Sequence, residues 1–354
     1  MTNQEFLTRV WNLEQVARPG LIVEETEPLA PGEPPIGTGA ARSTPELQQA
    51  LRAFQTLRKD RDDNVPALSA YLGSYIQATA FGAVEKTFED GHKYLAGPVI
   101  FNAGDVAKIK PLPLAATLLG QQIDVLRHLA ENTDGRYLIR AGDIQNPLGV
   151  AAMLWDTNDF YISLIEHPRA VHRLLEMITD VTIEYIHQMK AVCPTLLPVA
   201  WPAIWVPPDK GIYLADDTMA LVSPAIYEEF GVQYNNRLSR EFGGLILHSC
   251  TTNERYFPSI LKNEGLRSIN FAAQYSSDMK KIFQFFGGRV VILPHYVHGD
   301  NPQIGTLPEF IEKVLDCWTP QTPAIIYVGP KAEGGLQPEV FETFARRGFS
   351  LSLK

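Results

Sequence analysis

The sequence is short of cysteine, of net positive charge and of long apolar runs. Its three cysteines, Cys193, Cys250 and Cys317, are too few and too widely spaced for a disulfide framework, so we expect a reducing cytoplasm. A formal net charge of −9 argues against nucleic acid as a partner, because binding phosphates requires a basic surface. No apolar run is long enough to span a bilayer, and the first residues lack the pattern of a secretory signal. What remains is typical of a soluble globular protein of 354 residues, 45% of them hydrophobic.

From about residue 65 onward, apolar β-prone runs alternate with helical segments. Strands are expected over residues 68–80, 137–141, 196–205, 211–215, 244–247, 268–272, 289–293 and 324–328. Helices are expected over residues 114–131, 158–166, 168–192, 224–241, 253–263, 277–286, 308–318 and 338–347. Strands separated by helices run parallel, and eight of them predict an α/β fold closed into a (β/α)8 TIM barrel. An open doubly wound sheet is the rival, but the Gly-rich dinucleotide fingerprint is missing.

Residues 1–64 are expected to form an N-terminal helical extension, and residues 65–354 the barrel domain. The extension should contain a short amphipathic helix over residues 6–16, an irregular arm rich in Pro and Gly over 24–38 and a helix over 43–59. The sequence leaves open whether this extension is a lid, a homodimer contact or a mobile leader.

The carboxyl ends of the expected strands carry polar and aromatic residues. Barrel enzymes keep their active sites there, so these residues are the candidates for function. They are Asp143, Asn146, Trp201, Trp205, Asp216, Asp217, His248, Cys250, Gln274, Tyr275, His295, His298, Lys331 and Glu333. One of the two adjacent aspartates should point inward and the other outward, because side chains alternate along a strand.

His248 and Cys250 end the fifth expected strand. Residues two apart on a strand point the same way, so an imidazole and a thiol leave this strand on one side, close enough to bind one metal ion. The alternative is a core histidine beside a buried free cysteine, because cysteine often behaves as a small hydrophobe.

The order of several segments resembles the uroporphyrinogen decarboxylase superfamily, which includes the methylcobamide-dependent methyltransferases. The similar segments are Asp216-Asp217 through Phe230, His248-Ser-Cys250, and residues 149–189, 290–307 and 327–341. The resemblance covers roughly residues 65–350 and lies in the order of loose motifs. It implies a distorted TIM barrel with a deep cleft at the carboxyl ends of the strands.

Two chemistries occur in that superfamily, and the sequence favours one of them. The decarboxylases carry an N-terminal Arg-Gln-Ala-Gly-Arg segment that grips the carboxylates of a porphyrinogen. The corresponding residues 68–82 contain no arginine, and a clamp for a polyanionic substrate needs one. Porphyrinogen decarboxylation is therefore disfavoured.

The methyltransferases in the superfamily bind zinc through a His-x-Cys pair and a second cysteine after the eighth strand. His248 and Cys250 match the pair, but residues 329–335 contain no cysteine. The resemblance leaves Glu333, His295 or His298 as the third ligand, since zinc accepts carboxylate and imidazole. It implies transfer of a methyl group between a corrinoid on a partner protein and a small thiol or folate acceptor.

The remaining candidates are assigned to the surroundings of that zinc site. Asp217 and Asp216 are the predicted catalytic residues. The predicted substrate contacts are Asp143, Asn146, Gln274, Tyr275 and Trp205. Two alternatives stay open: a metal-independent decarboxylase or lyase that uses Asp216 or Asp217 as its acid, and a non-catalytic barrel subunit.

Overall fold

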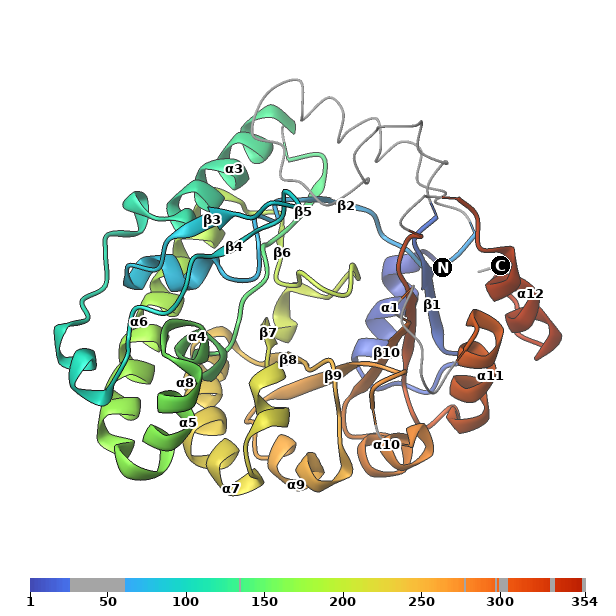
Figure 1. Ribbon diagram of the computed structural model, residues 1–354. Coiled ribbons are helices and arrows are strands. Elements are labelled where there is room, and N and C mark those ends of the chain that lie inside the picture. Colours follow the sequence, from blue (N-terminus) through green and yellow to red (C-terminus); the bar gives the residue numbers. More distant parts are fainter. Residues whose placement is uncertain are drawn as a thin grey trace.

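The computed structural model describes residues 1–25, 61–133, 135–276, 278–296, 298, 305–331 and 335–351. Within them, parallel strands form a barrel surrounded by helices (Figure 1). One sheet has the order β1 (Gly20–Val23), β11 (Ile325–Val328), β10 (Val291–Tyr296), β9 (Leu266–Ala272), β8 (Leu245–His248) and β7 (Ile212–Ala215). A second sheet has the order β2 (Ala67–Ser69), β5 (Leu138–Arg140) and β6 (Leu196–Leu197).

Backbone contacts join the two sheets at both sides. Tyr213 N donates to Pro198 O at 2.8 Å, and Gln145 pairs in parallel with Ala215. On the other side, Asp63 N donates to Leu21 O at 2.8 Å, just ahead of β2. The predicted α/β barrel is therefore confirmed, and it brings the carboxyl ends of its strands to one end of the molecule.

Helices connect the strands. They are α1 (Asn3–Trp11), α3 (Leu118–Thr133), α4 (Pro147–Leu154), α5 (Thr157–Glu166), α6 (Pro168–Val192), α7 (Pro224–Tyr227), α8 (Gln233–Phe242), α9 (Phe257–Ile260), α10 (Met279–Phe286), α11 (Leu307–Cys317) and α12 (Pro338–Arg346). A π-helical turn over Glu228–Val232 makes α7 and α8 one continuous run. Ser223 and Thr306 cap two of these helices: Ile226 N donates to Ser223 Oγ, and Thr306 forms a capping box with Glu309.

Two of the predicted strands are much shorter than the sequence suggested. Residues 68–80 supply only the end of β2, which stops at Ser69, and a 3₁₀ helix follows at Ile76–Phe81. Residues 196–205 supply only β6, since Pro198 has no N–H to continue the ladder. An antiparallel hairpin of β3 (Glu85–Thr87) and β4 (Lys93–Leu95) was not predicted.

Part of the expected N-terminal extension belongs to the barrel sheet. β1 pairs in parallel with β11, from Gly20 opposite Ile325 to Val23 opposite Val328. α1 ends at Trp11, earlier than predicted, and its Phe6, Leu7, Val10 and Trp11 share one buried cluster with barrel-interior residues such as Ile246 and Val291. The helix expected over residues 43–59 and most of the arm over 24–38 lie outside the described residues. The division at residue 64 stays a prediction.

Alternation along the strands separates the barrel interior from the layer beneath the helices. Ile22, Ile246, Leu293 and Tyr327 belong to the interior cluster, whereas their strand neighbours pack outward against helices. The inward positions nearest the carboxyl ends are polar. They include Arg140, His248, Asn270 and His295, so the interior changes from apolar to polar toward that end.

None of the helices in the described part of the chain is long and apolar enough to cross a membrane.

Candidate metal centre

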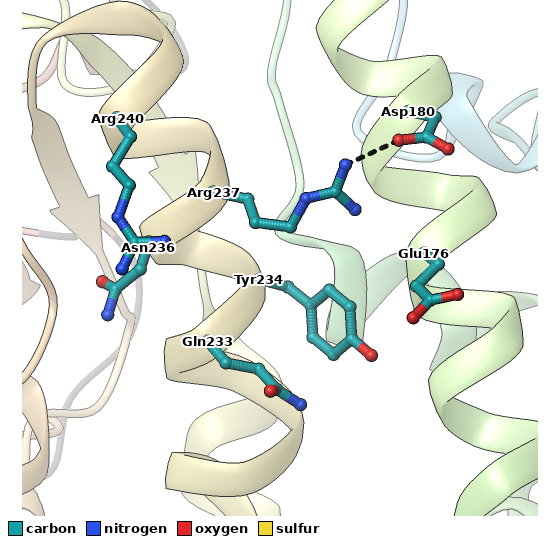
Figure 2. A pocket seen from close by; sticks show the side chains of 7 residues that line it. All are labelled: Glu176, Asp180, Gln233, Tyr234, Asn236, Arg237 and Arg240. Carbon is teal, nitrogen blue, oxygen red and sulfur yellow. Dashed lines mark hydrogen bonds and ion pairs between the residues drawn. The ribbon is translucent and has the colours of Figure 1, made fainter.

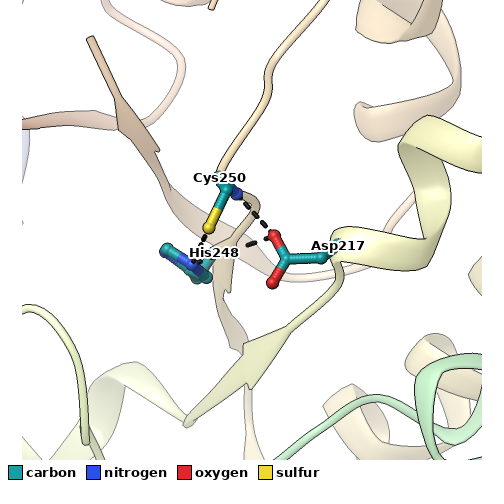
Figure 3. Close-up of side chains that lie close together, drawn as sticks. All are labelled: Asp217, His248 and Cys250. Atoms are coloured by element: carbon teal, nitrogen blue, oxygen red, sulfur yellow. Dashed lines mark hydrogen bonds and ion pairs between the residues drawn. The ribbon is translucent and has the colours of Figure 1, made fainter. Parts of the chain in front are cut away.

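Asp217, His248 and Cys250 meet at the carboxyl ends of β7 and β8 (Figure 3). One ligand atom from each lies within 4.8 Å of the other two. Cys250 Sγ is 3.5 Å from His248 Nε2, and His248 Nε2 is 3.9 Å from Asp217 Oδ1. Zinc bonds of about 2.0–2.3 Å place neighbouring tetrahedral ligand atoms about 3.3–3.8 Å apart. An imidazole, a thiol and a carboxylate at these separations fit a zinc ion with a fourth position left open.

Backbone geometry explains why these three side chains converge. β7 and β8 are neighbours, with Ala215 opposite His248. Asp216 N donates to His248 O at 2.7 Å, and Cys250 N donates to Asp217 Oδ1 at 2.6 Å. The aspartate is therefore held beside the thiol of the adjacent strand. His248 is buried, whereas Asp217 and Cys250 are exposed, so a ligand can reach the group from solvent.

Asn270 fixes the orientation of His248. His248 Nδ1 donates to Asn270 Oδ1 at 2.5 Å, so in the neutral imidazole the lone pair lies on Nε2, which faces Cys250. The amide of Asn270 is itself anchored, because its Nδ2 donates to Leu293 O at 2.6 Å and to His295 Nδ1 at 3.1 Å. Histidines that bind metals usually have such a partner on the second ring nitrogen. Sequence reasoning missed Asn270; the signal available was a polar residue at an inward position of the 268–272 run.

Two pKa values are raised at the centre. Burial, with Asp217 beside it, raises the pKa of the Cys250 thiol to about 12, so the metal-free thiol is protonated at neutral pH. Burial also raises the pKa of Asp143 to about 6, against the lowering effect of His248. A nearby cation favours the ionised forms of both groups.

The structure separates Asp216 from Asp217, as strand alternation required. Asp216 is completely buried, and its Oδ2 accepts from Asn235 Nδ2 at 3.0 Å. Burial raises its pKa to about 6. Asp217 lies with His248 and Cys250 instead. The backbone N–H of Asp216 donates to His248 O and so holds the end of β7 beside the end of β8.

The two histidines expected as third ligands lie outside the group of Asp217, His248 and Cys250. His295 is buried, and its ring centroid is 5.7 Å from that of His248, outside the three-residue group. Burial lowers the pKa of His295 well below its usual range, so it is neutral. His298 Nε2 donates to Gly329 O at 3.2 Å. Glu333 lies outside the described residues.

The predicted substrate contacts are spread over different roles. Asp143 accepts from Gln145 Nε2 at 2.9 Å, while its buried Oδ1 has no hydrogen-bond partner within the described chain. Asn146 is fully buried and caps α4 by accepting from Gly149 N at 2.9 Å. Trp205 is buried, and its carbonyl accepts from Trp11 Nε1. Gln274 is buried and Tyr275 half-buried. Asp143 interacts electrostatically with His248 and Asp217 of the centre.

A pocket of about 630 Å³ lies away from the strand ends, between α6 and α8 (Figure 2). Its walls include Glu176 and Asp180 from α6 and Arg237 from α8. Arg237 Nη2 donates to Asp180 Oδ1 at 2.7 Å, and Arg240 pairs with Glu264. Asp180, Arg237 and Arg240 are thus held in ion pairs, and the candidate site remains at the strand ends.

Comparison with known proteins agrees with this fold. Residues 55–197 match the family model described as uroporphyrinogen decarboxylase (URO-D). A methyltransferase from Methanosarcina mazei superposes with a TM-score of 0.63 over 98% of both chains, at 13% identity. An endo-beta-1,4-mannanase double mutant from Cellulomonas fimi superposes with a TM-score of 0.35 over 64% of this chain and 58% of its own, at 12% identity. No curated protein matches the sequence.

Proposed function

We propose that this chain, whose residues 55–197 match the uroporphyrinogen decarboxylase family model, is a zinc-dependent methyltransferase of that superfamily. It would transfer a methyl group between a corrinoid, carried by a partner protein, and a small thiol or folate acceptor. The observation that carries the proposal is the approach of Asp217, His248 and Cys250 to within 4.8 Å at the barrel end where this fold does its chemistry. The methyltransferase with the same overall fold supports the reaction class.

His248 Nε2, Cys250 Sγ and a carboxylate oxygen of Asp217 would hold the zinc ion. Bound zinc acts as a Lewis acid that lowers the pKa of a coordinated thiol and presents it as a thiolate. Asn270 keeps the proton of His248 on Nδ1, so that Nε2 stays available as a ligand. Asp143, whose buried Oδ1 lacks a partner among the described residues, is placed to accept a hydrogen bond from a substrate at the centre.

Metal content tests the proposal directly. Protein purified without oxygen and supplied with zinc should contain about one zinc per chain. His248→Ala, Cys250→Ala and Asp217→Ala should each lose most of it, because three protein ligands are the usual number for a catalytic zinc. Cys317→Ala is the matched control, since that cysteine lies at the end of α11. The loaded protein should then transfer methyl from a methylated corrinoid to a thiol.

Absence of zinc from the wild-type protein under these conditions would contradict the proposal. The metal-independent lyase would then be the better candidate. One observation favours it: burial raises the pKa of Asp143 to about 6, which keeps a part of this carboxyl group protonated near neutral pH and able to donate a proton.

A further inference from the structure

A second pocket, of about 680 Å³, lies at the outer surface where α5 meets α6. Its walls are Asp159 of α5, residues 102–104 and residues 166–170. None of these residues belongs to the candidate metal centre or to the predicted substrate contacts. The proposed function therefore gives this pocket no role. We call the pocket and the exposed side chains around it the α5 face.

Three large apolar side chains border the pocket and are open to solvent. Phe101 is 61% exposed, Ile162 51% and Ile165 67%. Phe101 directly precedes the lining residues 102–104, and Ile162 lies on one side of α5 with the lining residues Asp159 and Glu166, three residues before it and four after it. In the described part of the chain, six large apolar side chains are more than half exposed, and three of them gather here. Such a gathering marks a contact surface.

The backbone holds Phe101 in place. Ile100 N donates to Leu154 O at 2.9 Å, and Asp156 N donates to Ile100 O at 2.7 Å. Phe101 N donates to Asp105 Oδ2 at 3.2 Å. The segment before the pocket is thus fixed to the junction between α4 and α5. A side chain presented on fixed backbone loses little conformational entropy when a partner covers it.

Glu166 and Arg169 line the same pocket and carry opposite charges. Both are exposed, and within the described residues neither side chain forms a hydrogen bond or an ion pair. His167, at φ −130° and ψ 47°, separates α5 from α6, so the two charges stand on different helices. Other exposed charges do find a partner in the chain, such as Arg240 with Glu264. The pocket therefore presents one unpaired charge of each sign.

We propose that the α5 face binds a second copy of this chain in a twofold dimer, in which Phe101 of each copy enters the pocket of the other. Glu166 of each copy would then lie beside Arg169 of the other. A twofold contact sets one patch against itself, so both members of every contact must come from the same patch. The α5 face meets that condition twice, with an apolar side chain beside a pocket and a negative charge beside a positive one. A partner of a single charge would leave Glu166 or Arg169 facing its own sign.

This inference does not depend on the metal chemistry. It places the contact between copies on α5, whereas the sequence left the N-terminal extension as a possible dimer contact. Sedimentation of the full-length chain tests it without zinc or substrate. Wild type should sediment at twice the mass of one chain at micromolar concentration. A wild-type protein that stays monomeric up to its solubility limit would overturn the proposal.

Variants of the apolar side chains locate the contact. Phe101→Asp and Ile165→Glu should each raise the Kd of the dimer at least about 100-fold, because a buried charge replaces an apolar contact and a twofold interface contains the change twice. Leu336→Glu is the control, since this exposed leucine precedes α12, which lies across the barrel from α5 (Figure 1). It should leave the Kd unchanged. Wild-type dimerisation in Phe101→Asp would contradict the assigned contact.

Charge reversal tests the pairing and guards against misfolded variants. Glu166→Arg sets arginines against arginines across the interface and should weaken the dimer at least about tenfold. Arg169→Glu sets glutamates against glutamates and should do the same. An equimolar mixture of the two variants should recover the dimer, because every contact then joins opposite charges. Single variants that dimerise like wild type, or a mixture that stays monomeric, would show that copies do not meet through the α5 face.

Discussion

At the scale of single residues, the candidate centre depends on a hydrogen bond that reaches across two strands. Asn270 accepts from His248 Nδ1 and donates to Leu293 O and His295 Nδ1. Both N–H groups of the Asn270 amide donate to residues of β10, so β10 sets the orientation of the amide. The amide oxygen in turn sets the orientation of the His248 ring. Asn270 is therefore a positioning residue, and its effect should appear in metal affinity.

Replacing Asn270 with leucine should weaken zinc binding by about 10- to 100-fold, the usual cost of removing a partner of a histidine ligand. Asn270→Asp keeps the acceptor for Nδ1 and should bind zinc more tightly than Asn270→Leu. Competition with a chromophoric chelator gives the affinities. Asn146→Ala, which removes the buried cap of α4, should leave them unchanged. Wild-type affinity in Asn270→Leu would show that the histidine needs no such support.

We expect the free energy of unfolding to depend on pH through the buried carboxyl group of Asp216. Burial raises its folded pKa from 3.8 to about 6. An acid whose folded pKa is raised destabilises the native state once it ionises, so the penalty is absent below about pH 4 and complete above about pH 6. The shift corresponds to at most about 3 kcal/mol in the free energy of unfolding.

Asp216→Asn removes the ionisation and keeps an acceptor for Asn235. In the presence of chelator, its free energy of unfolding relative to wild type should therefore rise between pH 4.5 and pH 7.5, by up to about 2 kcal/mol. Urea unfolding at the two pH values measures the difference. A difference that stays constant with pH would mean that Asp216 titrates in its ordinary range.

At the scale of elements, β1 is held in the barrel by a buried ion pair. Arg18 Nη1 and Nη2 donate to the two carboxylate oxygens of Asp63 at 2.6 and 2.8 Å, and both side chains are buried. Asp63 Oδ2 also accepts from Leu21 N at 2.9 Å. One carboxylate thus ties the segment before β1 to the segment before β2, where the two sheets meet.

Removing one partner of this ion pair should strongly lower the free energy of unfolding. Asp63→Ala leaves the Arg18 guanidinium buried and unpaired, so it should lower the free energy of unfolding by about 3–5 kcal/mol. Glu254→Ala, which breaks the exposed pair with Lys281, should cost less than about 1 kcal/mol. Chemical denaturation measures both. Similar small losses in the two variants would show that β1 does not depend on Asp63.

At the scale of the whole molecule, the pattern of apolar runs determined the architecture. Alternating strand and helix signals predicted the barrel, because parallel strands need helical crossovers and eight such units close on themselves. The same pattern placed His248 and Cys250 on one side of a strand, since side-chain direction there has a period of two residues. Each of these inferences used only spacing within a short segment.

Tertiary structure alone decided which distant residues meet. β1 pairs with β11, which lies about 300 residues later in the chain, and no local sequence pattern predicts this pairing. Asp217 joins the histidine and cysteine because β7 lies beside β8, whereas the resemblance left Glu333, His295 or His298 as the third ligand. Asn270 gains its role from strand register and from the side chains opposite it. Register and closure are properties of the assembled barrel, so the sequence supplied the chemical groups and the fold selected their combinations.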